Sequence, residues 1–208
     1  MSVNLDTLLE WSSVICGLLY LILIIYEKIW CWFFGILGSA LSIWLFYRTQ
    51  LYSESILYIY YVIIGFYGWY IWSKKSIAKA ANDLDLSTDS KSTEVQESFK
   101  EWPILHHLIS ILSCGVLSLG VGYLFSNYTN ARSAYLDAFT TVFSFFASFL
   151  EAKKVVSAWL YWIILNGITI YLYDLRELDK YKLLTVVYFV ASFIGFYQWN
   201  KKYQLQKS

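Results

Sequence analysis

The chain has 208 residues, of which 58% are hydrophobic, 21% aromatic and only 15% charged. Soluble domains carry about a quarter charged residues, so this chain has too few charges to cover a surface exposed to water. Its formal net charge of +1 provides no positive field that would attract phosphates. These properties exclude an ordinary soluble enzyme and a nucleic-acid-binding protein, and they indicate an integral membrane protein in a lipid bilayer.

Seven apolar segments follow one another along the chain. Each holds enough residues to cross a hydrocarbon core of about 30 Å as a helix, and the absence of strict apolar–polar alternation argues against barrel strands. The sequence therefore predicts an all-α membrane protein with seven transmembrane helices. The predicted helices are residues 8–26, 30–46, 56–72, 104–126, 134–150, 156–173 and 183–199.

Polar residues divide these segments into parts. Residues 74–103 are rich in charge and poor in apolar side chains, so we predict a cytoplasmic loop there. Pro103 suits the first turn of the next helix, where its missing N–H costs nothing. The predicted order is a first three-helix bundle at 1–73, this loop, a linker helix at 104–127, and a second three-helix bundle with a cytoplasmic tail at 128–208.

The distribution of basic residues predicts the orientation in the membrane. Lysine and arginine concentrate on the cytoplasmic side of membrane helices. Of the 16 basic residues, 11 would lie on one side of the seven helices and 5 on the other. We therefore expect the N-terminus outside and the C-terminus in the cytoplasm.

Similar residues recur along the chain. Trp32 and Gly35 lie 127 residues before Trp159 and Trp162, and residues 65–69 resemble residues 195–199 at a spacing of 130. These matches predict two copies of a three-helix unit. The extra fourth helix restores the direction of the chain, so the two copies run parallel in a 3+1+3 order. Transporters with such repeats bind their substrates at the repeat interface near the midplane, and we expect an indole-walled chamber there.

The sixth predicted helix carries the most informative polar pattern. Trp159, Trp162 and Asn166 lie on one helical face. An unpaired amide near mid-membrane costs about several kcal/mol, so Asn166 needs a partner, either a neighbouring helix or a substrate. Two indole rings can enclose a planar ring, most strongly a cationic one. The alternative is interfacial tryptophan combined with an asparagine that joins helices.

Further candidates lie on the fifth and third predicted helices. Asp137 and Thr140 belong to a polar face of the fifth helix. Asp137 either is solvated or orients a ligand hydroxyl or an opposing donor, and the hydroxyl face could equally join helices. Tyr67 and Trp69 could form an opposite wall of the pocket, with packing at the membrane interface as the alternative.

The sequence predicts no metal site and no cofactor. His106 and His107 are adjacent, so their side chains point about 100° apart on a helix. The three cysteines have none of the spacings that bind zinc. We expect both histidines to be solvated at the membrane interface.

Several of these motifs, in this order, resemble the PnuC family of bacterial vitamin-precursor transporters. The resemblance covers nearly the whole chain, and it is the combination of motifs that is specific. The motifs are Glu27-Lys28, Trp32-Phe33-Phe34-Gly35, Gln50-Leu51-Tyr52, Tyr67-Gly68-Trp69-Tyr70, Leu136-Asp137, Thr140-Thr141 and Trp159-Leu160-Tyr161-Trp162 with Asn166.

The resemblance implies a helix arrangement similar to that of the SWEET sugar transporters. It also implies facilitated uptake of nicotinamide riboside across the inner membrane by alternating access, with a cytosolic kinase that traps the product, and assembly as a homotrimer. Thiamine or riboflavin is the alternative substrate. The substrate contacts carried over are Trp159, Trp162 and Asn166, followed by Asp137 and Thr140.

Two other classes compete with a transporter. An intramembrane enzyme would need a catalytic pair facing a cavity, and Asp137 with His106 or His107 is the candidate pair. A substrate-capture or assembly subunit that does not transport is the second. We predict a transporter and no enzyme.

Overall fold

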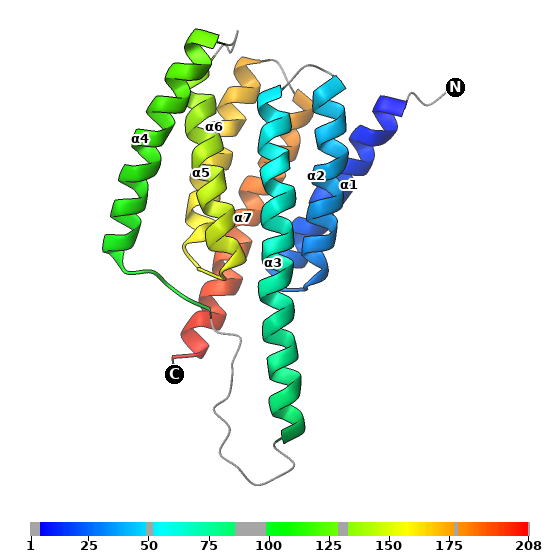
Figure 1. Cartoon of the computed structure of the whole chain (residues 1–208), viewed down its shortest axis with the longest axis vertical. Coiled ribbons are helices and arrows are strands. Elements are labelled where there is room, and N and C mark those ends of the chain that lie inside the picture. Colours follow the sequence, from blue (N-terminus) through cyan, green and yellow to red (C-terminus); the bar gives the residue numbers. More distant parts are fainter. Residues whose placement is uncertain (1–4, 49–51, 86–98, 129–132, 177–178, 208) are drawn as a thin grey trace. The chain divides into compact units, whose positions relative to one another are not determined.

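The protein is built from seven helices, as predicted. The computed structural model describes residues 5–48, 52–85, 99–128, 133–176 and 179–207, and every regular element in them is a helix (Figure 1). The all-α fold is therefore confirmed. The helices are α1 (Leu5–Ile25), α2 (Trp30–Arg48), α3 (Tyr52–Asp85), α4 (Ile104–Tyr128), α5 (Ala134–Ala152), α6 (Ala158–Leu175) and α7 (Asp179–Leu205).

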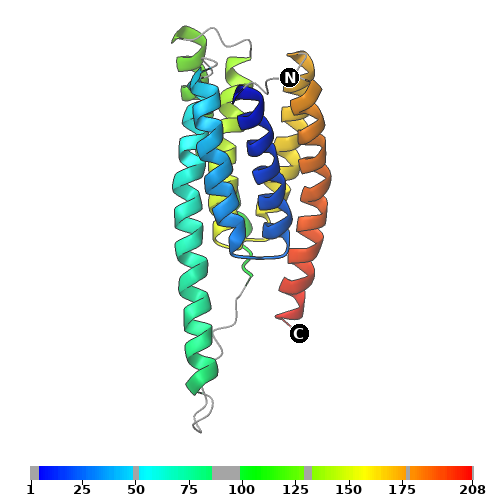
Figure 2. The ribbon, with the colours of Figure 1, turned by 90° about the vertical axis from the view of Figure 1, so that its right-hand side faces the viewer.

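The chain divides into two compact units. The first comprises Met1–Phe99 with Gln206–Ser208, and in it α2 packs against both α1 and α3 (Figure 2). The second comprises Lys100–Leu205, in which α5 packs against α4 and α6, and α6 packs against α7. The helix at 104–127, predicted as a separate linker, is thus part of the second unit.

The third helix is longer than the sequence prediction. Instead of ending near residue 73, α3 continues to Asp85 and has 34 residues. Residues 74–85 contain alanine and lysine but no glycine or proline, and these residues favour helix in water. Hydropathy detects only the part of a helix that is apolar, so residues 74–85 were wrongly assigned to a loop. At 1.5 Å per residue α3 exceeds the membrane core of about 30 Å, and both views show it running past the α1–α2 turn.

Two helices meet a strict length and composition criterion for spanning a membrane. They are α4 and the part of α7 from Tyr181 to Leu205. The helices α1 and α2 contain shorter apolar stretches, Trp11–Ile25 and Trp30–Trp44. Most side chains of α4 are exposed and apolar, including Leu112, as expected of a helix that contacts lipid.

The two helix triplets have the same connections. α1–α3 and α5–α7 match at a constant spacing of 127 residues, so neither triplet has an insertion relative to the other at the helix ends compared here. This agreement confirms a parallel repeat of three helices with α4 between the copies. The corresponding helix ends are Ile25 and Ala152, Arg48 and Leu175, and Tyr52 and Asp179.

The first turn of each triplet has the same backbone conformation. Glu27 and Lys154, which correspond in the repeat, have φ angles of 56° and 57°, in the left-handed region that non-glycine residues rarely adopt. In each turn a backbone N–H then reaches back five residues, as in a Schellman helix end. These bonds run from Lys28 N to Leu23 O at 2.8 Å and from Val155 N to Leu150 O at 3.0 Å.

A pair of tryptophans packs over a glycine in each unit. Trp32 lies edge-on to Trp72, and Trp159 lies edge-on to Trp199, with ring centroids 5.4 Å apart and planes at 90° in both pairs. Trp32 is 2% exposed and Trp159 is 1% exposed. We call these residues and their glycines, Gly68 and Gly195, the tryptophan scaffold.

This scaffold corrects the predicted alignment of the repeat. The sequence comparison paired Gly65 with Gly195 at a spacing of 130. In the structure the glycine that lies against the indole of the first unit is Gly68, at a spacing of 127. The run Phe66-Tyr67-Gly68-Trp69-Tyr70-Ile71-Trp72 offers two tryptophans, and letter matching alone chose the wrong one.

Candidate substrate site in the second unit

The structure separates the two tryptophans that were predicted to bind substrate together. A β-carbon on Gly195 would lie 2.6 Å from three ring atoms of Trp159, so the glycine backbone covers a face of this indole. The edge of Trp199 covers another side. In this structure Trp159 therefore has no accessible face for stacking, and it serves as scaffold.

Trp162 lies one turn further along α6 and differs in its surroundings. It is half-buried and packs against a cluster of Phe143, Ala147 and Leu165 from α5 and α6. Its Nε1–H is buried and has no hydrogen-bond acceptor among the residues that the structure describes. Trp162 thus combines an aromatic surface with an unused donor.

Asn166 is joined to the neighbouring helix. Its Nδ2 donates a hydrogen bond to the hydroxyl of Ser192 on α7 at 3.1 Å. Ser192 in turn donates to the backbone carbonyl of Tyr188 at 2.7 Å. The amide, which required a partner, therefore has one on a neighbouring helix, and the sequence had left open whether a helix or a substrate would supply it.

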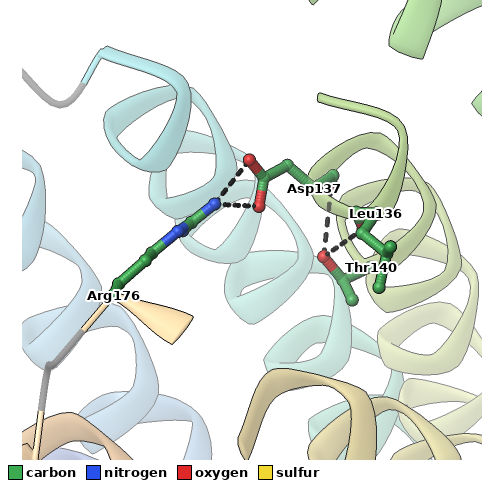
Figure 3. Close-up of polar contacts among 4 residues, drawn as sticks. All are labelled: Leu136, Asp137, Thr140 and Arg176. Carbon is green, nitrogen blue, oxygen red and sulfur yellow. Dashed lines mark hydrogen bonds and ion pairs between the residues drawn. The ribbon is translucent and has the colours of Figure 1, made fainter. Parts of the chain in front are cut away.

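Asp137 and Arg176 form an ion pair at the opposite end of the bundle from the α5–α6 turn. One guanidinium nitrogen of Arg176 lies 2.5 and 2.6 Å from the two carboxylate oxygens of Asp137 (Figure 3). Arg176 follows the last residue of α6, so the pair joins that helix end to the start of α5. Of the roles considered for Asp137, the structure shows pairing with an opposing donor.

The hydroxyl of Thr140 is used within its own helix. It lies 3.1 Å from the carbonyl oxygens of both Leu136 and Asp137 (Figure 3). Such backbone bonding is common for threonine inside helices. It gives Thr140 a local role beside the Asp137–Arg176 pair.

The two candidates from the third predicted helix lie on α3 in the first unit. Trp69 takes part in an aromatic cluster with Trp30 and Phe33, at centroid distances of 6.0 and 6.4 Å. Tyr67 is half-buried and is already engaged by other residues. Trp30 and Phe33 are exposed, so the cluster has the composition of an aromatic belt at a membrane surface.

One polar cluster was missed by sequence reasoning. The His107 side chain is only 15% exposed, and its Nδ1 lies 3.0 Å from the Tyr161 hydroxyl. Its Nε2 lies 3.1 Å from Ser157 Oγ and 3.4 Å from a carboxylate oxygen of Glu101. Because a carboxylate only accepts, it favours a proton on Nε2 and leaves Nδ1 to accept from Tyr161. The prediction of solvated histidines is correct for His106, which is exposed, and wrong for His107.

This cluster fastens the start of α4 to the α5–α6 turn. The second carboxylate oxygen of Glu101 accepts the backbone N–H of Ser157 at 3.1 Å. Next to it, Lys100 exchanges two backbone hydrogen bonds with this turn, one with Lys154 and one with Val156, each at 3.0 Å. The insertion of α4 into the second unit therefore rests on specific polar contacts as well as on apolar packing.

Replacement of His107 is expected to destabilise the protein. His107→Ala leaves the Ser157 and Tyr161 hydroxyls without this partner, at a cost of about 1–3 kcal/mol. His106→Ala, at the exposed neighbouring position, should change stability by less than about 0.5 kcal/mol. Thermal unfolding of both variants in detergent measures the difference. Equal melting temperatures would show that the cluster contributes nothing to stability.

The repeat shows which features belong to the second unit alone. The scaffold occurs in both units, whereas the indole, amide and hydroxyl found at three other positions of the second unit have small counterparts in the first. This asymmetry marks the three positions as specialised. The pairs are Trp162 and Gly35, Asn166 and Ser39, and Ser192 and Gly65.

These features define a helical membrane transporter built on a parallel repeat, with an uncharged polar and aromatic face in its second unit. A family model described as nicotinamide mononucleotide transporter matches residues 7–201, and the chain belongs to this family, the PnuC transporters. The predicted class, a transporter and not an enzyme, is thereby confirmed. Family membership also makes the chain a multi-pass protein of the bacterial inner membrane.

Individual relatives agree with this assignment. The chain is 27% identical over 212 residues to the nicotinamide riboside transporter PnuC of Escherichia coli K12, covering 90% of this chain and 81% of that one. It is 28% identical over 198 residues to the PnuC protein of Haemophilus influenzae, covering 94% and 80%. A crystal structure of the vitamin B3 transporter PnuC has the same fold, with a TM-score of 0.74 at 22% identity and coverage of 97% and 84%.

Proposed function

We propose that this protein takes up nicotinamide riboside by facilitated diffusion. The observation that carries the proposal is the similarity over at least 90% of the chain to proteins named as nicotinamide riboside transporters. The second unit offers matching chemistry, because Trp162 presents an indole and Asn166 an amide within one turn of α6. An indole stacks well on a cationic ring such as nicotinamide riboside carries, and an amide can bond its polar groups.

The charge of the site favours the riboside over its phosphorylated form. Residues 158–173 of α6 contain no charged side chain. A phosphate would bring about two negative charges into this region, where burial without a cationic partner is costly. Arg176 beyond the end of α6 is already engaged by Asp137. We therefore place the mononucleotide of the family description second to the riboside as substrate.

The transport cycle follows from the repeat. We propose alternating access by movement of one triplet relative to the other, as in other transporters with internal repeats. Trapping of the substrate by a cytosolic kinase would then give uptake its direction. The N-terminus outside and the C-terminus in the cytoplasm, and assembly as a homotrimer, stay predictions of the same kind.

Uptake by the purified protein in liposomes tests this function. We expect entry of nicotinamide riboside without any kinase until both sides are equal, and little or no entry of nicotinamide mononucleotide. Trp162→Ala should reduce uptake about tenfold or more, because it removes the stacking surface. Trp11→Ala, which removes an exposed tryptophan of α1, is the control and should leave uptake unchanged.

Thiamine is the second candidate substrate, because it also carries a cationic ring. Competition of thiamine and riboflavin with nicotinamide riboside in the same liposomes separates the candidates. Entry of thiamine in preference to the riboside would replace the proposed substrate. Uptake of the riboside that Trp162→Ala leaves unchanged would remove α6 from the site.

A further inference from the structure

We propose that Ser192 is a positioning residue that sets the specificity of the transporter by fixing the amide of Asn166. In this arrangement Asn166 presents its oxygen, and not its nitrogen, to the substrate. The inference rests on the proposed function, because it assigns the polarity of the group that the substrate must bring to Asn166. That group is a hydrogen-bond donor, either a hydroxyl or a carboxamide N–H.

The direction of the hydrogen bonds carries the first step. Ser192 is 1% exposed, and its hydroxyl proton is directed to the Tyr188 carbonyl at 2.7 Å. A hydroxyl has one proton, so the Ser192 oxygen can only accept from any second partner. The group of Asn166 that faces it at 3.1 Å must therefore be the NH₂ group.

The second step concerns the other end of the amide. With its nitrogen held by Ser192, Asn166 has its Oδ1 as the remaining acceptor. This oxygen has no hydrogen-bond partner among the described residues, and it is not among their fully buried unpaired atoms. An amide oxygen inside a membrane protein requires a donor, and a substrate can supply one.

The repeat supplies an independent argument. The counterparts of Asn166 and Ser192 in the first unit are Ser39 and Gly65, so the amide and the hydroxyl are both missing there. A β-carbon on Gly65 would meet the Ile36 side chain at 2.6 Å. The first unit therefore fills with an apolar side chain the place that the serine occupies in the second. The amide and its serine occur as a pair, as expected if the serine exists to orient the amide.

Two neutral changes of the substrate measure the polarity of the site. The N,N-dimethylcarboxamide analogue of nicotinamide riboside lacks the amide donors, and the 2′,3′-dideoxy analogue lacks the ribose hydroxyl donors. For the wild-type protein we expect one of these analogues to bind about tenfold more weakly than the parent, because an oriented acceptor is left unpaired. If both analogues bind as well as the parent, no donor faces Asn166 and the proposal is overturned.

Ser192→Ala tests the role of the serine. Without the hydroxyl, the Asn166 amide can rotate and offer either its oxygen or its nitrogen, so the preference for the parent over the analogue should fall to about twofold. Ser192→Thr keeps a hydroxyl and should keep the preference. The control is Ser148→Ala on α5, because Ser148 is also buried and also donates to a carbonyl of its own helix, that of Ser144 at 2.8 Å, without an asparagine partner.

The outcomes separate this inference from the proposed function. If the wild-type protein binds no nicotinamide riboside, the proposed substrate is wrong. If it binds the riboside and Ser192→Ala keeps the wild-type preference, only the positioning role is wrong. Loss of the preference in Ser148→Ala as well would assign the effect to general loss of packing and would also overturn the role of Ser192.

Discussion

Gly195→Ala is expected to prevent the second unit from packing normally. The new methyl group would lie 2.6 Å from three atoms of the Trp159 ring, closer than non-bonded carbon atoms approach. The ring is 1% exposed and is held by Trp199, so it has no free space into which it could shift. Overpacking of this kind costs about 1–3 kcal/mol and occasionally more. Thermal unfolding and the yield of monodisperse protein in detergent measure the loss.

Gly167→Ala is the matched control on the neighbouring helix. A β-carbon there would have Phe189 as its nearest listed neighbour at 3.7 Å, an ordinary contact. Because alanine favours helix over glycine by about 1 kcal/mol, this variant should be as stable as the wild type or more so. Gly68→Ala, which would place its methyl group 2.4 Å from Trp32, should resemble Gly195→Ala. A Gly195→Ala protein as stable as Gly167→Ala would show that the scaffold is loosely packed.

Trp159→Ala and Trp32→Ala are expected to destabilise their units by similar amounts. Each removes a fully enclosed indole that packs edge-on against a second tryptophan and flat against a glycine. Removal of a large buried aromatic side chain costs about 3–5 kcal/mol. Melting temperatures of the purified variants, together with substrate binding by whatever fraction stays folded, measure the effect.

Trp162→Ala provides the contrast for these two variants. Trp162 is half-buried and has no tryptophan counterpart in the first unit, so its loss should lower the melting temperature less and uptake more. The assignment of Trp159 to the scaffold would be refuted by the opposite pattern. That pattern is a Trp159→Ala protein with the melting temperature of the wild type and no binding of the riboside.

The sequence predicted the number and order of the helices, because apolar runs of this length have few alternatives in a membrane. It also predicted a parallel repeat, because Trp32 and Trp159 recur at the true spacing. It missed the end of α3, since residues 74–85 form a helix that is polar and carries no hydropathy signal. It aligned Gly65 with Gly195, because a run rich in tyrosine and tryptophan allows matches at several spacings.

The site was predicted only in part, because partners distant in the sequence leave no local pattern. Trp162 and Asn166 stood out from their spacing on α6, but Ser192 lies 26 residues away on another helix. A correct alignment of the repeat would have marked it, since Gly65 stands opposite. The spacing within α4 hid His107, because neither of its ring contacts belongs to that helix. Whether the sequence-predicted residues contact a substrate stays a prediction that the variants above test.

The constant spacing of 127 residues has a practical consequence. Each position of the second triplet has a naturally occurring substitute at a known position of the first, on a backbone with the same turns. Ser39 and Gly65 thus act as a reference in the same polypeptide for what the framework requires when no solute has to be recognised. Differences between paired positions point to selectivity, while identities such as those of the tryptophans point to architecture.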